Sequence, residues 1–290
     1  LKSGGSINLQ PSATTRFIID DNSRISLSNN DLGTSNTVFG KSIGTIDAGT
    51  NYNTFIGEGI IGAGGISDAT ENTALGWYSL RSLTTGDINV SIGSTAMEKN
   101  TTGGGNVGIG VMGLRYNVTG VNNTAIGTYS QKGVSGNSHS NNTSVGANSL
   151  FSVTTGGNNT ALGVSAGYSN TTGDNNTLIG YNTMGPLTGL RNTAIGAGAM
   201  QDTDAGSTSG GSNDNIFMGY NAGGGTWADA ASNYNIAIGN NVMDAAMNGA
   251  LNNTAVGHNS LSDLTTGDNN VAMGYNAGDA ITTGANNTCI

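Results

Sequence analysis

A five-residue pattern recurs along almost the whole chain and constrains its fold more than any other feature. Fifteen times an Asn is followed by a β-branched residue, a usually small residue, a hydrophobic residue and a Gly, as in residues 123–127. The fifteenth copy, residues 287–290, lacks the Gly. The Gly residues usually lie 17 positions apart, with spacings of 19, 20 and 23 in a few places. A unit this short buries an apolar face only against its neighbours, so the repeat predicts a stacked solenoid.

The composition agrees with a stack of short strands and turns. The chain of 290 residues contains 49 Gly, 2 Pro and 9% charged residues, which is typical neither of a helical enzyme nor of a charged disordered tail. The net charge is -9, and the 9 Lys and Arg residues are scattered without a basic stripe, so nucleic acid is not an expected partner. No apolar run approaches the roughly 20 residues of a membrane-spanning helix, so we expect no membrane insertion.

We number each copy from its Gly, which is position 0. Position −3 is always Thr, Val or Ile, which suits a pleated strand, and position −1 is always hydrophobic. Because alternate side chains of a strand point to opposite faces, we expect positions −3 and −1 to face the core. The small residue at −2 and the Gly then face a close neighbour, either the opposite wall of a thin coil or another chain. Enlarging Ala125 or Ala161 at −2 is therefore expected to disturb assembly.

The second half of each copy predicts one further strand or bend. Position +3 is usually Ala or Ser and position +4 is usually Leu, Met, Ile or Gly, which returns an apolar side chain to the core. A Thr-Thr-Gly turn follows in several copies, as at residues 84–86, where Gly can supply a positive φ. The predicted fold class is all-β: a parallel β-solenoid, or β-roll, of about fifteen coils, each with two short strands and two turns. At about 4.8 Å per coil this makes a rod roughly 70 Å long.

The repeat also divides the chain. Residues 36–290 form the predicted solenoid shaft, while residues 1–35 lie outside the repeat. Short strands are expected at residues 17–19, Phe-Ile-Ile, and at residues 24–28, Arg-Ile-Ser-Leu-Ser. We interpret residues 1–35 as an N-terminal cap or a junction.

Position −4 is Asn in every copy. Stacked in register, these side chains are expected to hydrogen-bond to one another or to the turns as a structural ladder. The predicted ladder comprises Asn36, Asn53, Asn72, Asn89, Asn106, Asn123, Asn142, Asn159, Asn176, Asn192, Asn215, Asn235, Asn253, Asn270 and Asn287.

The motif Thr-Ala-Ile-Gly-x-x-Ala/Ser, at residues 124–130 and 193–199, resembles the head repeats of trimeric autotransporter adhesins. Those repeats form a parallel β-roll in each of three chains. The longer form Asn-Asn-Thr-Ala-Ile-Gly, with Thr-Thr-Gly between copies, is similar to repeat-rich tail-fibre proteins of bacteriophages, especially those with a self-cleaving C-terminal chaperone. The resemblance covers residues 36–290, although the period is longer than in the adhesins and no coiled-coil stalk, anchor or chaperone domain is present in the sequence. It implies a homotrimeric fibre.

Three functions follow from the repeat and the resemblance. The first is a structural segment of a trimeric phage tail fibre, located in the virion, that positions host-receptor binding. The alternative is the head of a bacterial trimeric adhesin at the cell surface. The third is an ice-binding β-solenoid with a flat Thr face, which is disfavoured if the Thr residues at −3 point inward. The expected partner is the chain itself as a homotrimer, with a host cell-surface glycan or protein as a further candidate.

Few residues offer catalytic or metal chemistry, so we predict no enzyme, no cofactor and no metal site. His139 lies in a predicted loop and His258 at position +1, and both are expected to face solvent. The Gly-Asp-Asn turns at Asp174 and Asp268 are similar to calcium-binding turns, but Asp recurs too rarely at this place to build a column of ions. Cys289 takes position −2 and is expected to be a buried small residue rather than a reactive thiol.

Insertions in the repeat are the candidate binding surface. The longest spacing follows Gly196 and inserts residues 201–212, and the next copy inserts residues 223–229. Such insertions leave a solenoid on one face and often bind ligands. An inserted Trp either stacks on a sugar ring or covers an apolar edge of the coil, and a pair of acids in the first loop is better read as solvated than as a glycosidase pair. The candidate surface-binding residues are Asp202, Asp204, Tyr220, Trp227 and Asp229.

Overall fold

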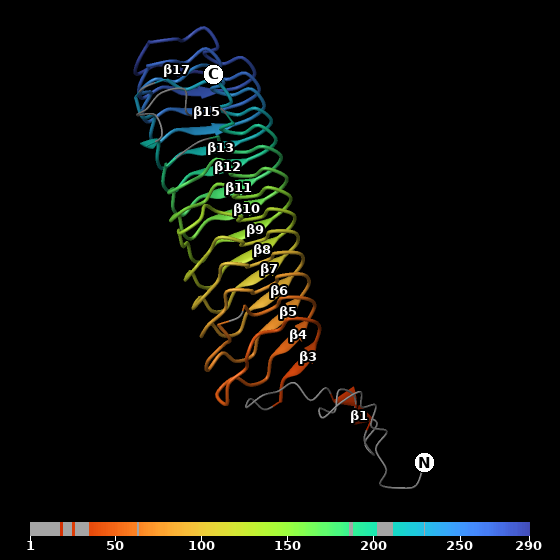
Figure 1. Ribbon diagram of the computed structural model, residues 1–290. Coiled ribbons are helices and arrows are strands. Elements are labelled where there is room, and N and C mark those ends of the chain that lie inside the picture. The colour runs from red at the N-terminus through yellow and green to blue at the C-terminus, as the bar shows by residue number, and fades with distance from the viewer. Residues whose placement is uncertain are drawn as a thin grey trace.

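The chain folds into one long parallel β-solenoid (Figure 1). The computed structural model describes residues 18–19, 25–26, 35–62, 64–185, 188–201, 211–228 and 230–290. Fifteen strands form a single parallel sheet in which every strand pairs with the next one along the chain, and the described part of the chain contains no helix. The predicted fold class, an all-β solenoid with about one coil for each copy of the repeat, is confirmed.

Two short strands precede the solenoid. β1 (Ile18–Ile19) and β2 (Ile25–Ser26) pair antiparallel with each other and form a sheet separate from that of the solenoid. Both lie within the segments for which the sequence predicts strands.

The solenoid strands coincide with positions −3 to −1 of the repeat. They are β3 (Thr37–Phe39), β4 (Thr54–Ile56), β5 (Thr73–Leu75), β6 (Val90–Ile92), β7 (Val107–Ile109), β8 (Thr124–Ile126), β9 (Thr143–Val145), β10 (Thr160–Leu162), β11 (Thr177–Ile179), β12 (Thr193–Ile195), β13 (Ile216–Met218), β14 (Ile236–Ile238), β15 (Thr254–Val256), β16 (Val271–Met273) and β17 (Thr288–Cys289). Neighbouring strands pair position by position, for example Thr160 with Thr177 and Leu162 with Ile179. Equivalent side chains therefore form continuous columns along the rod.

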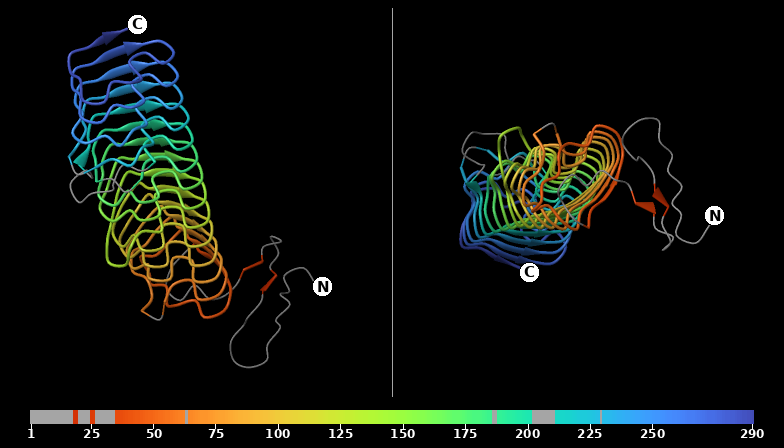
Figure 2. Two further views of the ribbon diagram at one scale, coloured as in Figure 1. Left: turned by 90° about the horizontal axis from the view of Figure 1, so that it is seen from above. Right: turned by 60° about the horizontal axis from the view of Figure 1, so that its bottom comes forward.

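The prediction of two strands in each coil is wrong. Each coil contains one strand of three residues or fewer, and the segment after the Gly consists of bends and turns that stack from coil to coil (Figure 2). A second strand is ruled out because positions +2 and +4 take positive φ values, such as 55° at Tyr78 and 52° at Leu80. The bend still returns an apolar side chain to the interior, because Leu80, Leu114 and Leu150 at +4 are fully buried.

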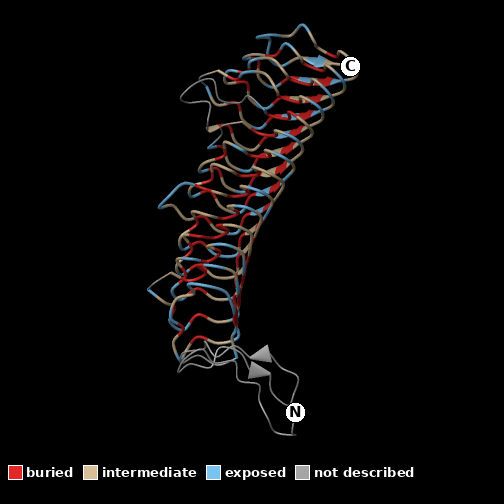
Figure 3. Ribbon diagram, turned by 45° about the vertical axis from the view of Figure 1, so that its right-hand side comes forward, coloured by how far each residue is buried: buried red, intermediate tan, exposed pale blue. Residues whose placement is uncertain are grey.

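The expected facing of the strand residues is also wrong. In β8 and β10 the middle residue, at −2, is buried, whereas the residues at −3 and −1 are half-buried or exposed. Ala125 and Ala161 therefore fill the inside of the coil and do not form an assembly surface. The reason is that the bends and turns after the Gly form the opposite wall of the coil and lie close behind each strand. The inside therefore holds one layer of mostly small side chains. Buried segments recur along this interior in every coil (Figure 3).

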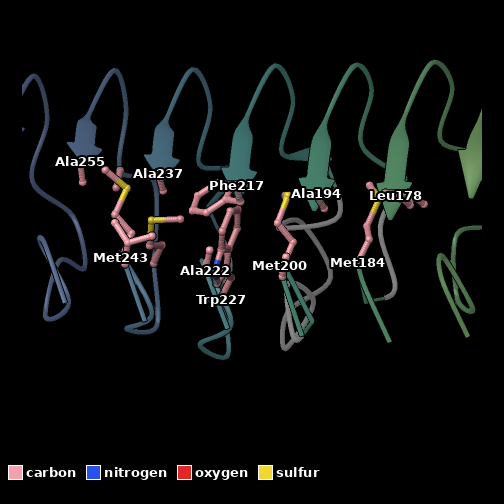
Figure 4. Close-up of a cluster of buried hydrophobic side chains, with 14 of the residues drawn as sticks. Leu178, Met184, Ala194, Met200, Phe217, Ala222, Trp227, Ala237, Met243 and Ala255 are labelled. Carbon is pink, nitrogen blue, oxygen red and sulfur yellow. The ribbon is translucent and has the colours of Figure 1, made fainter. Parts of the chain in front are cut away.

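Side chains on the two walls of the interior complement each other in size. Gly lies opposite a large residue in two places: a Cβ at Gly167 would lie 2.6 Å from Leu178 Cδ1, and one at Gly223 would lie 2.5 Å from Phe217 Cδ1. Figure 4 shows this single layer of core side chains between the strands and the opposite wall. An interior this thin tolerates neither added methylenes nor voids.

The Asn side chains at position −4 form a hydrogen-bonded ladder along the rod. Asn142 Oδ1 accepts bonds from the backbone N of Asn159 at 2.9 Å and from its Nδ2 at 3.1 Å. Asn159 Nδ2 also donates to the backbone O of Gly173, at position −7 of the next coil, at 2.8 Å. The backbone bond to Oδ1 is present between all fourteen successive pairs. Only Asn combines an acceptor and two donors on so short a side chain.

The Gly at position 0 stacks directly on the Gly of the next coil. Gly127 has a φ of 136°, which L side chains rarely adopt, and a Cβ there would lie 2.5 Å from the carbonyl O of Gly146. The close neighbour expected for this Gly is thus the next coil, and neither the opposite wall nor another chain.

Replacing Asn159 with Asp should destabilise the solenoid strongly. The new carboxylate oxygen would face Asn142 Oδ1 and Gly173 O, which both accept hydrogen bonds, so the variant loses two bonds and buries a charge. We expect a loss of about 3 kcal/mol at pH 7, measured by urea denaturation followed by circular dichroism. This burial raises the folded-state pKa of the new Asp. The loss in free energy of unfolding is therefore small below about pH 4 and grows as the pH rises.

Asn158→Asp is the matched control, because Asn158 is the preceding residue and is exposed. It should change stability by less than about 0.5 kcal/mol. Equal losses in the two variants, or a deficit in Asn159→Asp that does not depend on pH, would contradict the role given to the ladder.

Replacing Ile88 with Asn should stabilise the protein. Position −5 has positive φ throughout the solenoid and is Asn in seven coils, but Ile88 holds a φ of 58° there with 60% of its surface exposed. A β-branched residue is strained in this region, so Ile88→Asn should gain about 1 kcal/mol in denaturation. Val121→Asn changes an exposed residue outside the left-handed region and should bring no such gain.

Candidate functional site

The outer face of the sheet carries an unbroken column of apolar side chains at position −1. Leu162 is 46% exposed and Met273 is 55% exposed, and the other members are half-buried or exposed. Since neighbouring strands are in register, the column follows the rod from β3 to β17. It comprises Phe39, Ile56, Leu75, Ile92, Ile109, Ile126, Val145, Leu162, Ile179, Ile195, Met218, Ile238, Val256, Met273 and Ile290.

The column at position −3 lies beside it on the same face. Ten of its fifteen members are Thr and the others are Val or Ile, all of them half-buried or exposed. We call the two columns together the apolar band. With about 4.8 Å between coils, the band covers several hundred Å² of one face, about as much as the largest apolar patch of a typical soluble monomer, and such patches are often functional. The band is therefore the candidate interaction surface of the molecule.

Trp227 does not lie on the surface. Its side chain is fully buried, its Nε1 donates to the backbone O of Gly223 at 3.1 Å, and its ring lies 5.5 Å from that of Phe217 (Figure 4). The prediction that Trp227 is a surface-binding residue is wrong, because the inserted residues turn inward. Gly223 has no side chain and so leaves room in the core for the indole. Outside the coil, the same ring would expose a large apolar area to water.

The other predicted loop residues separate into two groups. Tyr220 is 62% exposed at position +1, the same position as Tyr181 and Tyr275. Asp202, Asp204 and Asp229 lie outside the described residues. The structure therefore does not bring the five candidate residues together into one site.

The Asp residues of the Gly-Asp-Asn turns bind backbone groups. Asp174 Oδ1 accepts a hydrogen bond from the backbone N of Gly157 at 2.6 Å, and Asp268 Oδ1 accepts one from Leu251 N at 2.8 Å. Both bonds connect a turn to the preceding coil. No group of three or more His, Cys, Asp or Glu side chains placed to hold a metal ion occurs in the part of the chain that the structure describes. Cys289 is half-buried and packs against the core.

His139 is buried, contrary to the expectation that it faces solvent. Only 2% of its surface is exposed, and it occupies position −7, where every other described coil has Gly, Ala, Ser or Thr. Its Nδ1 lies 3.4 Å from Asn123 Oδ1 and 3.3 Å from Asn142 Nδ2, while its Nε2 has no hydrogen-bond partner among the described residues. Burial lowers the pKa of His139 to about 4. His258, in contrast, is exposed as expected and stacks on Tyr275.

A polar layer surrounds His139 and divides the core. Ser130, Gln131 and Ser144 are fully buried in the same region, and Gln131 Nε2 donates to Ser144 Oγ at 2.9 Å. One apolar cluster lies before this layer, within residues 38–125, and the other follows it. The sequence signal for this layer is the polar residue at position +4, which is apolar or Gly in the other copies.

Acidification should destabilise the protein through His139. The folded-state pKa of His139 lies below its unfolded value. The contribution of the neutral imidazole to the free energy of unfolding is therefore complete above about pH 6.5 and is lost as the pH falls toward about 4. The difference in pKa corresponds to about 3 kcal/mol. His139→Gly, which restores the residue found in neighbouring coils, should remove this loss from the pH dependence of urea denaturation. His258→Asn should keep it, and an unchanged pH profile in His139→Gly would show that another group is responsible.

No helix among the described residues has the length and apolar character needed to span a membrane. Compared with models of protein families, with curated proteins and with solved structures, the chain matches none of them. The resemblance to adhesin heads and to phage tail fibres therefore stands on the repeat motif, and the solenoid and its apolar band stand on the structure. The function has to be inferred from the geometry of this surface.

Proposed function

We propose that the protein is the structural shaft of a homotrimeric fibre, and that the apolar band is the surface by which three chains assemble. The observation that carries the proposal is the length of the band, which runs along the whole sheet with its hydrophobic side chains outward. A surface this large and apolar is stabilised when a partner removes it from water.

A second copy of the chain is the partner that fits the band best. The band repeats once per coil, about every 4.8 Å, so a partner follows it over the whole rod only if it has the same rise. Parallel copies in register meet this condition, because each presents the same column of side chains at the same height. The number three is taken from the resemblance to trimeric β-roll fibres. The assembly surface is thus the outer face of the sheet, and not the small-residue face expected from the sequence.

A rod of this construction suits a spacer that bears load. Backbone hydrogen bonds join each coil to the next along the sheet and through the turns, for example from Thr154 N to Thr171 O at 2.8 Å. Many backbone groups therefore find their hydrogen-bond partner in the neighbouring coil. Three parallel copies also present three copies of any surface contact, which increases avidity. These properties support a fibre that holds a receptor-binding element away from a particle.

The repeat favours a phage tail fibre over a bacterial adhesin head. The double Asn before the strand and the Thr-Thr-Gly turn, as at residues 154–163, are similar to the phage repeats and lengthen the coil beyond the adhesin pattern. We therefore propose a location in the virion, with the bacterial cell surface as the alternative. Both alternatives share the trimeric rod.

One observation favours the ice-binding alternative. The Thr column at −3 faces outward, so the objection that it points into the core is wrong. The column is interrupted by Val or Ile in five coils, however, and a bulky apolar column lies directly beside it. A thermal-hysteresis measurement on the purified protein tests this function, and we expect no activity.

The assembled state should depend on the apolar band. Light scattering should give a particle of three times the 29.0 kDa chain mass for the wild type. The double variant Ile126→Glu and Leu162→Glu places two charges on the band and should dissociate the particle into monomers.

Val111→Glu together with Val164→Glu is the matched control. These residues are 40% and 47% exposed, against 38% and 46% for Ile126 and Leu162, but they lie at position +1, outside the band. The control should remain trimeric. A monomeric wild type, or equal dissociation of both double variants, would overturn the proposed assembly surface.

A further inference from the structure

The fold gathers basic residues that are dispersed in the sequence. Of the six Lys and Arg residues in the described part of the chain, four lie at positions +5 or +6 of consecutive coils. We call residues 81–82, 98–99, 115–116 and 132–133 the basic ridge; its four basic residues are Arg81, Lys99, Arg115 and Lys132. The expectation that the chain has no basic stripe is therefore wrong.

Backbone hydrogen bonds stack the ridge from coil to coil. Ser82 N donates to Glu98 O at 3.0 Å, Lys99 N donates to Arg115 O at 3.0 Å, and Tyr116 N donates to Lys132 O at 3.1 Å. Neighbouring ridge positions are therefore one coil apart, about 4.8 Å. The ridge is a row of closely spaced cations on a protein whose net charge is -9.

One acid lies within the ridge and is already neutralised. Glu98 is buried, and it accepts a hydrogen bond from Arg115 Nε at 2.7 Å and lies 3.0 Å from Lys99 Nζ. Burial alone would raise the pKa of Glu98, but the bonds to Lys99 and Arg115 outweigh it, and the pKa is lowered. The ridge thus keeps an excess of positive charge at neutral pH, and Glu98 holds two of its cations in place.

Arg81 lies between two surface hollows. One, of about 350 Å³, is lined by Gly62, Gly64, Arg81 and Lys99, and the other, of about 330 Å³, is lined by Ile61, Tyr78 and Arg81. Around Gly64 there is open space, since a Cβ there would meet no atom within 4 Å. The hollows are at the lower end of the size range of small-molecule sites.

Aromatic rings accompany the cations. The Arg81 guanidinium carbon lies 4.2 Å from the centroid of Tyr78, and Lys132 Nζ lies 4.7 Å from that of Phe151. Phe151 in turn stacks on Tyr168 with 4.9 Å between ring centroids. An aromatic face packs on the apolar face of a sugar, and Arg or Lys pairs with a carboxylate or sulfate.

We propose that the basic ridge binds a short stretch of an acidic saccharide, with Arg81 pairing with its acidic group and Tyr78 packing beside it. The ligand is short because the rest of the rod is acidic and repels a long polyanion such as duplex DNA. The ridge lies outside the apolar band, so the inference does not depend on the number of chains in the fibre. It gives the shaft a binding role of its own.

Calorimetric titration of the full chain with tetragalacturonate, which carries a carboxylate on each sugar, tests the inference. The wild type should bind it and should not bind neutral maltotetraose. Arg81→Glu should weaken binding by about tenfold or more. Lys41→Glu is the matched control, because it changes the net charge equally at an exposed residue outside the ridge, and it should stay within about twofold of the wild type.

Circular dichroism checks that the variants are folded, and Arg81→Gln replaces Arg81→Glu if the charge reversal prevents folding. Absence of binding to tetragalacturonate, equal affinity for maltotetraose, or equal weakening by the substitutions at Arg81 and Lys41 would each overturn the proposal. Tighter binding of an oligothymidylate than of tetragalacturonate would also overturn it, because the ridge would then respond to negative charge without recognising a sugar.

Discussion

The hydrogen bonds of the Asn ladder determine the rest of the structure. Each side chain accepts bonds from the next coil's strand and donates one to the turn before that strand, so it fixes where every strand begins. This holds whatever the length of the intervening loop. Asn192 and Asn215 are 23 residues apart, yet Asn215 N still reaches Asn192 Oδ1 at 3.1 Å, as across the usual spacing. Insertions are accommodated elsewhere in the coil, and the strands remain in register.

The ladder and the Gly column together make the coil thin. The thin coil in turn explains why bulky apolar side chains lie on the outer surface. The carbonyl that receives the Asn bond belongs mostly to Gly, and a Cβ at Gly103 would lie 2.3 Å from the backbone O of Gly120. The inside of the coil holds side chains from positions −2, +3 and +4, together with Leu83, Val153 and Leu264 at +7. The bulky residues at −1 do not fit there, so they point outward. The apolar band thus lies on the outer face of the sheet, where no other part of the described chain covers it.

The sequence predicts the columns of this structure but not which of them point inward. The β-branched residues at −3 locate every strand, and the uniform Asn and Gly columns mark the contacts between coils. The facing is misjudged because the usual rule, that bulky apolar residues lie inside, presumes a core thick enough to hold them. Leu80 takes a left-handed conformation that its residue type gives no reason to expect, whereas Asn at −5 does signal one. The basic ridge could have been predicted from the sequence, because Arg115 and Lys132 lie one repeat period apart.

The departures from the repeat show how a uniform rod acquires local differences. Inside, His139 and Gln131 insert a polar layer, so the apolar core on either side is interrupted where the ladder itself continues. Coils of such a rod are stabilised mainly by their nearest neighbours, and the polar layer marks the boundary between the two apolar clusters. Outside, positions +1, +5 and +6 carry no ladder bond and vary from coil to coil. Chemistry is therefore added at these positions without disturbing the register, as the basic ridge and the exposed Tyr181, Tyr220 and Tyr275 at +1 show.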